Sequence, residues 1–511
     1  MYAERVLGII RQRMVTRWLG AGLLVAVLAG LSAGRAGAAE DAFSFHRDDV
    51  LGTSLDLTVR GVTKTQADAC EQAVLTELKR LEKVLSTWDS NSEISRLAAA
   101  KGPFTCSEDL FAVLRACDLW RTRTGGAFNA HLGEVLDLWK HGAKTGAVPD
   151  AAALSAAVKK VGAPAWRLSP SSRMLNLLRP PSLRVDALAK GYIVDKALAA
   201  GAAKAPHATG ILLDIGGDIA AWGSRGSDGA SGWNVGVADP LHPADNARLL
   251  TTIRLVNRAV ATSGDYARYF EIGSKRYSHI IDPRTGRPAG GVTGATVVAP
   301  DTMSADAVVT ALCVLDPKRG VAMVNYLPLT ECLIVAADGK QYTSRYWRNL
   351  EVASTDPAVP KVARAGWPKG YACDVRLSLR RHRKRPIVAA WIADGNNKPV
   401  KMLALWCKQS KYHRKLPRWY ALGAFRYTAR NVTRASRPAG VYTLTWDGTD
   451  SKGKPVPAGT YTVMIELARE KGTHATMSAS IACGTTKTAS AEMKGNVEAN
   501  GAEVRYGPAR R

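Results

Sequence analysis

The sequence predicts two folded domains of different class: a mixed α/β (α+β) domain over residues 40–353 and a smaller all-β sandwich over residues 371–485. The chain has 511 residues, of which 46% are apolar and 22% charged, so it is long enough for two or three domains with sizeable cores. Up to about residue 350, strand-like segments alternate with apolar residues at helical spacing. Beyond residue 370 only short alternating segments remain, separated by turns rich in glycine and proline, which is typical of a sandwich.

The first forty residues have the three-part pattern of a secretory signal peptide. Three arginines between residues 11 and 17 precede an apolar run over residues 18–31, and Ala36 and Ala38 then form an A-x-A cleavage site. The run is shorter than the roughly 20 apolar residues that span a bilayer, so removal of residues 1–39 is favoured over a retained anchor helix. We therefore expect an exported, periplasmic protein, which would be membrane-associated if the segment is kept.

The charge of the chain indicates acidic partners. The formal net charge is +26, which would suggest nucleic acid for a cytosolic protein. For an exported protein it predicts instead an anionic lipid, a cell-wall polymer or an acidic protein surface, and no nucleic acid. The densest basic run, residues 376–386, has alternating apolar members and is interpreted as a strand with one solvated basic face; a dedicated anion site is the alternative.

Eight cysteines in an exported chain permit disulfides. Their spacing is irregular, with no C-x-x-C or zinc pattern. A bridge between Cys106 and Cys117 and buried free thiols are both compatible with the sequence.

The predicted elements of the first domain follow from periodicity and turn signals. In order, they are a strand at 51–59, an amphipathic helix at 67–85, a helix at 109–122, a loop leading into a helix over 184–198, a buried strand within 211–223 that ends in Gly216-Gly217-Asp218, a hairpin turning at Gly273–Ser274, and a helix containing Asp306 and Thr310. Gly216 and Gly217 suit either a close approach of the backbone to a ligand or a tight turn between two strands.

The predicted linker is residues 354–370, which are rich in proline and lack periodicity. The sandwich follows over 371–485. Residues 486–511 are polar, and we expect them to form a disordered tail.

One segment suggests metal-assisted chemistry on a phosphate compound. Asp306 and Thr310 are four residues apart, which places a carboxylate and a hydroxyl one turn apart on the same helical face. Such oxygen ligands suit a hard cation such as Mg²⁺. His279 lies upstream in a polar loop and suits general-base work. The alternative is a helix-terminal acid with a core-facing threonine. The Lys190–Gly191 pair near a helix start adds a weak phosphate signal.

Eight sequence segments, taken together in their order along the chain, resemble a single known family. LGTSLDLTV, STWDSNSEISRL, GGAFNAHLGEVLDLW, ALAKGYIVDKA, ILLDIGGDIAAWG, ATSGDYARYF, YSHIIDPRTGRP and SADAVVTALCVL resemble the ApbE family, whose members are exported FAD:protein FMN transferases. The resemblance covers about residues 43–350.

The resemblance implies a set of site residues. The Mg²⁺ ligands would be the Asp306 and Thr310 side chains and the backbone carbonyl of Ala187, and the catalytic histidine would be His279. The FAD contacts would be Leu51, Trp88, Ala127, Phe128, Asn129, Lys190 and Ile280.

Three positions depart from the family pattern. Leu51 replaces a methionine, an apolar swap that packing contacts tolerate, and Asn129 replaces an aspartate. Arg184 stands where an acid is common, unless Asp186 takes that place in a shortened loop. The last two departures leave open how adenine and ribose are recognised.

The implied reaction is the Mg²⁺-dependent transfer of FMN from FAD to a Ser or Thr hydroxyl of an exported acceptor protein, with release of AMP. The alternatives are an FAD pyrophosphatase that gives FMN and AMP, and a flavin-binding protein without turnover. The family's acceptor motif is an Asp shortly before Ser/Thr-Gly-Ala-Thr/Ser. Residues 293–296 read Thr-Gly-Ala-Thr without the Asp, and we interpret them as the start of a strand.

The C-terminal domain resembles a domain of unknown function that is fused to ApbE-like enzymes or encoded near them. Its segment 437–470 is similar to the Ig-like fold of flagellar hook-capping proteins, so we expect an Ig-like sandwich with a docking or substrate-presenting role. Four tryptophans are predicted to belong to the core and rim of the sandwich and not to a ligand box: Trp391, Trp406, Trp419 and Trp446.

Overall fold

The computed structural model describes residues 42–224, 231–241, 249–264, 269–273, 275–352, 367–382, 384–407, 410–426, 433–434, 436–437, 439–469 and 472–508. The predicted signal peptide and most of the predicted linker lie outside these ranges. None of the helices in the described ranges combines the length and the apolar composition that crossing a bilayer requires.

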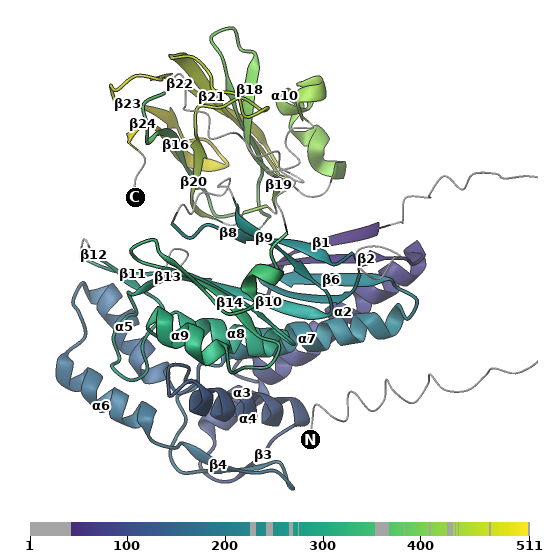
Figure 1. Ribbon diagram of the computed structural model, residues 1–511, viewed down its shortest axis with the longest axis vertical. Coiled ribbons are helices and arrows are strands. Elements are labelled where there is room, and N and C mark those ends of the chain that lie inside the picture. Colours follow the sequence, from purple (N-terminus) through teal and green to yellow (C-terminus); the bar gives the residue numbers. More distant parts are fainter. Residues whose placement is uncertain are drawn as a thin grey trace, which may run out of the picture. The chain divides into compact units, whose positions relative to one another are not determined.

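Helices and strands alternate in the first domain (Figure 1). Its helices are α2 (Lys64–Leu85), α3 (Glu93–Ala99), α4 (Glu108–Arg123), α5 (Gly133–Thr145), α6 (Ala151–Gly162), α7 (Asp186–Lys204), α8 (Thr302–Leu312), α9 (Pro317–Val324) and the 3₁₀ helix η1 (Trp347–Asn349). Its strands are β1 (Ala42–Val50), β2 (Thr53–Arg60), β3 (Phe104–Thr105), β4 (Trp166–Ser169), β5 (Met174–Leu177), β6 (Gly210–Ile215), β7 (Asp218–Gly223), β8 (Trp233–Ala238), β9 (Leu249–Leu255), β10 (Arg258–Gly264), β11 (Tyr269–Ile272), β12 (Lys275–Ser278), β13 (Val292–Ala299), β14 (Glu331–Ala336) and β15 (Gln341–Thr343).

The main sheet of this domain has eight strands in the order β1-β2-β6-β7-β10-β13-β14-β15. Every neighbouring pair is antiparallel, which makes the domain α+β. In Figure 1 helices α2, α7 and α8 lie against one face of this sheet. The predicted elements are confirmed, and at Gly216–Gly217 the alternative of a tight turn between two strands is the one observed, in the hairpin β6–β7. The predicted hairpin around residue 273 is the pair β11–β12, although Ser274 lies outside the described residues.

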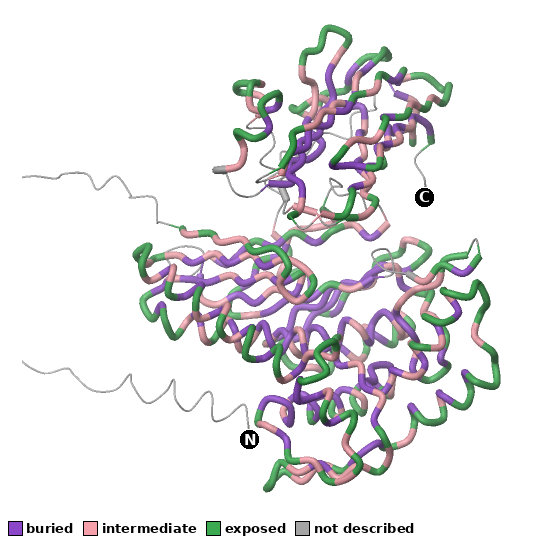
Figure 2. Tube along the Cα trace, turned by 180° about the vertical axis from the view of Figure 1, so that it is seen from behind, coloured by how far each residue is buried: buried purple, intermediate pink, exposed green. Residues whose placement is uncertain are grey.

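The central strands β10, β13 and β14 of the sheet are largely buried on both faces, and Figure 2 shows buried segments in this part of the domain. Ala261 and Val297 belong to the large core beneath the helices, whereas their chain neighbours Val260 and Val298 belong to a second core that includes Trp347 and the pair β8–β9. This alternation follows from the two-residue period of a strand. It also explains why these strands read as continuous apolar runs in the sequence.

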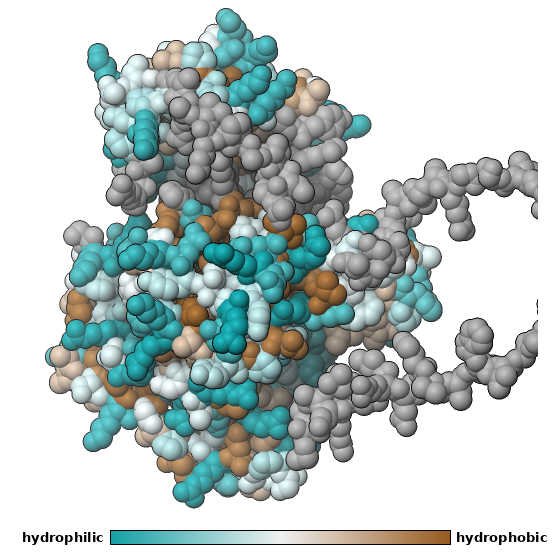
Figure 3. Space-filling view, in the orientation of Figure 1, coloured by the Kyte–Doolittle hydropathy of each residue, from teal (hydrophilic) through white to brown (hydrophobic). Residues whose placement is uncertain are grey.

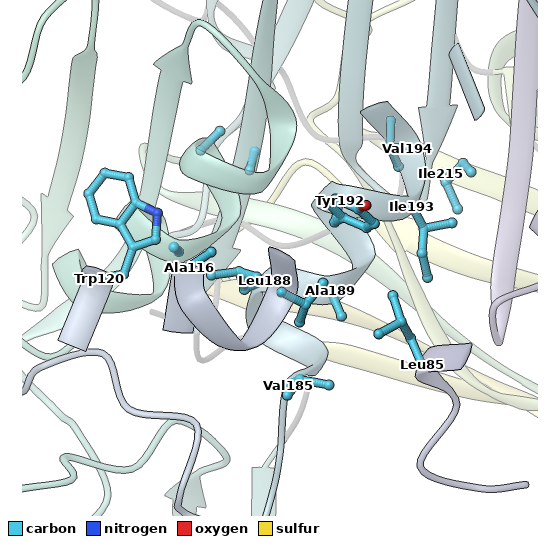
Figure 4. Close-up of a cluster of buried hydrophobic side chains, with 14 of the residues drawn as sticks. Leu85, Ala116, Trp120, Val185, Leu188, Ala189, Tyr192, Ile193, Val194 and Ile215 are labelled. Atoms are coloured by element: carbon cyan, nitrogen blue, oxygen red, sulfur yellow. The ribbon is translucent and has the colours of Figure 1, made fainter. Parts of the chain in front are cut away.

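Helix α7 is anchored in the larger core by one face. Figure 4 shows Leu188, Ala189, Tyr192 and Ile193 of α7 among buried side chains from other elements. The Tyr192 hydroxyl donates to Asp109 of α4 at 2.7 Å, and the carboxylate of Asp109 is also 2.7 Å from a guanidinium nitrogen of Arg80 on α2. A hydrogen-bonded ion pair of this kind fixes the helix in rotation as well as in position.

The C-terminal domain is a sandwich of two sheets. One has the order β20-β16-β24-β23 and the other β19-β18-β17-β21-β22. The elements are β16 (Tyr371–Leu379), β17 (Ile387–Ala393), β18 (Pro399–Trp406), η2 (Ser410–Lys415), α10 (Pro417–Tyr420), β19 (Thr433–Arg434), β20 (Gly440–Trp446), β21 (Gly459–Ala468), β22 (His474–Cys483), β23 (Ala489–Lys494) and β24 (Ala499–Pro508).

The predicted disordered tail is wrong. Residues 489–508 form β23 and β24, and β24 pairs with the whole length of β16. The segment reads as polar because many of its residues alternate between core and solvent: Met493, Val504 and Tyr506 are at most 4% exposed, whereas their chain neighbours Lys494 and Arg505 are exposed and half-buried. The sandwich therefore extends to residue 508 and does not end at residue 485.

The four predicted structural tryptophans are all buried, with exposed fractions of 0–4%. Trp367, which we placed in the linker, belongs to the same core: its ring lies 4.9 Å from that of Trp446 and 5.0 Å from that of Tyr506. Aromatic pairs at these distances stabilise a core beyond the area they bury. The C-terminal domain therefore includes Trp367.

All eight cysteines are free and buried, so the alternative of a Cys106–Cys117 bridge is not realised. Burial raises the pKa of both the Cys106 and Cys70 thiols to about 11, which keeps them protonated.

On the face in Figure 3, hydrophilic residues are interspersed with hydrophobic ones, as expected when the apolar side chains are largely enclosed in cores.

Candidate functional site

The predicted metal pair lies on α8, and α8 packs directly on α7. Gly191 of α7 makes this close approach possible, because a Cβ atom there would stand 2.4 Å from the carbonyl oxygen of Thr302. The N–H of Gly191 donates to Oδ2 of Asp306 at 3.4 Å. The sequence thus places Asp306 and Thr310 one turn apart on one helix, and the fold brings a second helix against the carboxylate.

The start of α8 is held by a carboxylate from α7. Asp195 accepts the N–H groups of Thr302 and Met303 at 2.8 and 3.0 Å, and Asp301 caps the same turn by accepting from Ser304 at 2.7 Å. Carboxylates that accept from free N–H groups at a helix N-terminus stabilise that end. Asp195 therefore sets the position of α8 relative to α7, a role that nothing in the local sequence signals.

A second predicted site residue, Lys190, lies beside this contact. Its Nζ atom is 2.6 Å from Oδ2 of Asp218, the first residue of β7. The Asp218 side chain is only 4% exposed. The Gly216–Gly217 turn, with φ of +64° and +94°, lets β7 begin immediately after β6 and places Asp218 there.

Ala187 lies in the first turn of α7, four residues before Gly191. Helix geometry directs the carbonyl of residue i toward the N–H of residue i+4, so the Ala187 carbonyl faces the N–H group that donates to Asp306. On α8, Thr310 is half-buried and lies one helical turn after Asp306.

Asp306 has an electrostatic environment that suits a cation. It is 7% exposed, and burial raises the pKa of its carboxyl well above the usual range. The charge of Asp218 raises this pKa further, Lys190 and the Gly191 N–H lower it, and Asp186 raises it again. Arg184, the position that departs from the family pattern, forms an ion pair with Asp137 at 3.0 Å.

Oxygen donors from a buried carboxylate, a hydroxyl and a carbonyl are the ligands that Mg²⁺ prefers, and a divalent cation would offset the excess of carboxylates. The described residues contain no group of three or more His, Cys, Asp or Glu side chains arranged to hold a metal. Among the predicted metal ligands, only Asp306 has a side chain of these four types. The other two ligands are the Thr310 hydroxyl and the backbone carbonyl of Ala187.

The other predicted site residues lie on separate elements. His279 follows β12 and is half-buried, and Ile280 beside it is buried, its carbonyl accepting from the N–H of Ala289 at 2.8 Å. Leu51 forms the β1–β2 turn with φ +50° and packs against the larger core. Trp88 lies in the loop between α2 and α3, where its side chain is 88% exposed.

Residues 127–129, also predicted to contact FAD, are buried in the turn after α4. Ala127 and Phe128 are 1% and 2% exposed. Asn129 uses both ends of its amide within the protein: Nδ2 donates to the Val161 carbonyl at 3.2 Å, and Oδ1 accepts from the His131 N–H at 2.9 Å. The Asn129 amide therefore supplies a donor, absent from an aspartate, that holds the turn before α5 to the end of α6.

Comparisons with known proteins show which families the two domains match. Residues 51–334 match the model of the ApbE family, and residues 370–500 match a family described as predicted periplasmic protein (DUF2271). The FAD:protein FMN transferase of Treponema pallidum is 32% identical over 342 residues, which are 62% of this chain and 91% of that protein. The protein of the same name from Vibrio cholerae is 32% identical over 289 residues, covering 54% of this chain and 84% of the relative.

Among solved structures, the ApbE protein of Thermotoga maritima covers 61% of this chain and is itself covered completely, with a TM-score of 0.55 and 29% identity. The family model matches more than half of the 511 residues, and the fold agrees with that of a solved member. The chain therefore belongs to the ApbE family, and it is an enzyme of the transferase class.

Proposed function

We propose that the protein transfers FMN from FAD to a Ser or Thr hydroxyl of an exported acceptor protein and releases AMP. The names of the relatives support flavin transfer, and the description of the C-terminal family as periplasmic supports an acceptor outside the cytoplasm. The observation that carries the proposal is the buried Asp306 carboxylate, which lies between α7 and α8 with Lys190, Asp218 and Asp186 in its electrostatic environment.

These residues fit a hard divalent cation, held by the side chains of Asp306 and Thr310 and the carbonyl of Ala187. When bound, Mg²⁺ would supply charge stabilisation for the pyrophosphate oxygens. The Lys190 ammonium adds a positive charge at the same place, near the start of α7, where N–H groups also favour phosphate.

In the proposed reaction, the acceptor hydroxyl attacks the FMN-side phosphorus of FAD. The new oxygen–phosphorus bond forms as the bond to the AMP phosphate breaks, and AMP leaves with the electron pair. His279 is the proposed base that takes the hydroxyl proton. Leu51, Trp88, residues 127–129 and Ile280 are the proposed FAD-binding positions; Trp88 supplies an exposed ring for stacking.

The chain itself contains Thr-Gly-Ala-Thr at residues 293–296, but the structure disfavours this segment as an acceptor. It lies within β13, in the interior of the main sheet, and the prediction of a strand start there is confirmed. Thr296 is 3% exposed, and its hydroxyl is 3.0 Å from that of Thr262. The acceptor is therefore proposed to be another protein.

The test is incubation of the protein with FAD, Mg²⁺ and a peptide in which Asp precedes Ser-Gly-Ala-Thr, followed by mass spectrometry. A mass gain of one FMN supports the transferase. AMP release without an adduct would identify a pyrophosphatase, and tight FAD binding with neither product would identify a flavin-binding protein.

Two variants test the metal assignment within this assay. Asp306→Asn and Thr310→Val are expected to lower the adduct yield at least about 100-fold by removing oxygen ligands, whereas Asp338→Asn, at an exposed turn, should leave it unchanged. An undiminished yield in Asp306→Asn would rule out the assignment.

A further inference from the structure

The C-terminal domain contains a cavity of about 570 Å³ whose lining carries an excess of positive charge. It is lined by Arg380, Arg381, His382, Arg469, Val497 and Asn500. None of these six residues is acidic, and Arg380, Arg381 and Asn500 are exposed. Three residues of the sequence run 376–386, interpreted above as a solvated basic face, therefore line an open hollow in the surface.

Backbone contacts hold the basic residues in place. The N–H of Arg380 donates to the Glu498 carbonyl at 3.1 Å, and its Nε donates to the Ala499 carbonyl at 3.2 Å. Nε2 of His382 lies 2.8 Å from the Val497 carbonyl. The chain after β16 is thus fastened to the loop before β24, which keeps the cavity formed.

The charge balance favours an anion. Glu498 is the carboxylate that faces these groups; it is fully buried and lies 2.8 Å from Nε of Arg469 and 3.6 Å from Nε2 of His382. Three guanidinium groups line the cavity, and this one carboxylate is already engaged by one of them. Arg381 makes no hydrogen bond or ion pair with any other residue that the structure describes, so its five donors are available.

The apolar part of the lining indicates the kind of anion. Val497, which also lines the cavity, is 52% exposed. A ligand with both carboxylates and apolar side chains would satisfy the guanidinium groups and cover this valine. A flat membrane surface fits less well, because Arg469, whose side chain is 25% exposed, is held against Glu498 within the cavity.

We propose that this cavity binds an acidic, partly apolar peptide segment of the acceptor protein. Guanidinium groups recognise carboxylates through paired hydrogen bonds, and such contacts steer association as well as strengthen it. The proposal rests on the proposed function in one respect, namely that the substrate is a protein. The C-terminal domain then raises the effective concentration of that protein at the flavin site.

The direct test is binding of the full chain to a fluorescein-labelled peptide of alternating Glu and Val residues, measured by fluorescence anisotropy. We expect Arg381→Glu to raise Kd about tenfold, since one charge-assisted contact is lost and a repulsion is added. Lys398→Glu, at an exposed turn that does not line the cavity, is the matched control for net charge and should bind as the unmodified chain does.

Three outcomes would overturn the proposal. The first is an equal change of Kd in Arg381→Glu and Lys398→Glu, and the second is equal binding of a peptide of alternating Gln and Val residues. The third is displacement of the Glu–Val peptide by inorganic phosphate at the concentrations at which phosphate by itself occupies the cavity. Binding of phosphatidylglycerol vesicles that is lost in Arg381→Glu, with no peptide binding, would assign the cavity to a membrane surface instead.

A kinetic test separates this proposal from the proposed function. One acceptor peptide carries the Asp and Ser-Gly-Ala-Thr motif alone, and a second carries the motif followed by the Glu–Val tract. The unmodified chain should show about tenfold higher kcat/KM for the second peptide, through KM, and Arg381→Glu should abolish that preference without altering kcat. If both peptides form the FMN adduct with the same kcat/KM, the proposed role of the cavity is contradicted. No adduct with either peptide contradicts the transferase, while the anisotropy result still decides the cavity.

Discussion

The Nζ atom of Lys190 on α7 lies 2.6 Å from Oδ2 of Asp218 on β7, and both residues act on the carboxyl of Asp306 on α8. Burial raises the pKa of Asp218, and Lys190 lowers it. One cation therefore compensates two buried carboxylates on two different elements. This relationship links the main sheet to both helices of the proposed site.

Replacing Lys190 by methionine should destabilise the protein by about 3 kcal/mol, because a buried carboxylate loses its partner. Lys190→Met combined with Asp218→Asn should recover most of that loss. The matched control is Lys340→Met, which removes the cation of an exposed ion pair and should cost less than about 1 kcal/mol. Urea unfolding measures all of these variants. An equal loss of unfolding free energy in Lys190→Met and Lys340→Met would show that Lys190 does not compensate a buried carboxylate.

Mg²⁺ should raise the Tm of the unmodified protein and should raise that of Lys190→Met as well, since a cation bound at Asp306 stabilises only the folded state. Removal of Mg²⁺ with a chelator should reverse the increase. An equal increase in the Tm of Asp306→Asn would show that Mg²⁺ binds at a different site.

Gly191→Ala should destabilise the protein by roughly 1–3 kcal/mol, because its Cβ would stand 2.4 Å from the carbonyl oxygen of Thr302 and force α7 and α8 apart. Flavin transfer should fall with it, since Asp306 and Ala187 lie on the two separated helices. Gly162→Ala on α6 is the control: nothing lies within 4 Å of that Cβ, so thermal unfolding should show unchanged or slightly higher stability. A neutral effect of Gly191→Ala would mean that the helices can separate without cost.

Trp88→Ala should leave the free energy of unfolding within about 0.5 kcal/mol of the original, because the side chain is 88% exposed. The KM for FAD should nevertheless rise about fivefold to tenfold, as expected for the loss of a stacking contact. Tyr326→Ala, which removes another highly exposed ring (89%), is the control. An unchanged KM for FAD in Trp88→Ala would remove this residue from the proposed binding site.

The stability of the first domain should fall as the pH rises from about 6.5 to above 9, because of His46. Burial by itself lowers the pKa of this histidine, but hydrogen bonds to Asp48 and Asp56 outweigh burial and raise the pKa to about 9. A raised folded-state pKa contributes stability that is fully present below the unfolded value of 6.5 and is lost as the pH rises through 9.

The size of this effect is on the order of 3 kcal/mol at most. His46→Gln should flatten the pH dependence of unfolding over this window, while His141→Gln, at an exposed position on α5, should keep it. Identical pH profiles for the unmodified protein and His46→Gln would contradict the assignment.

Much of the fold could be predicted from the sequence because helix and strand periodicity is a local property. The apolar spacing of residues 67–85 predicted most of α2, and the four-residue spacing placed Asp306 and Thr310 on one face of α8. The order of eight motif blocks indicated the ApbE family, which the family model confirms. The strands β23 and β24 were missed because strands with one solvated face and many small residues resemble a polar tail in composition.

By itself, the sequence determined which residues carry oxygen, nitrogen and positive charge, and on which element each would lie. Only the tertiary structure decided their partners. Asp195 holds the start of α8 across 107 residues, Lys190 pairs with an aspartate on another element, and Arg380 is fastened to a loop more than 100 residues away. Such pairings depend on how helices pack on the sheet and how distant strands align. Periodicity reports the face on which a side chain lies, but not the group that it meets there.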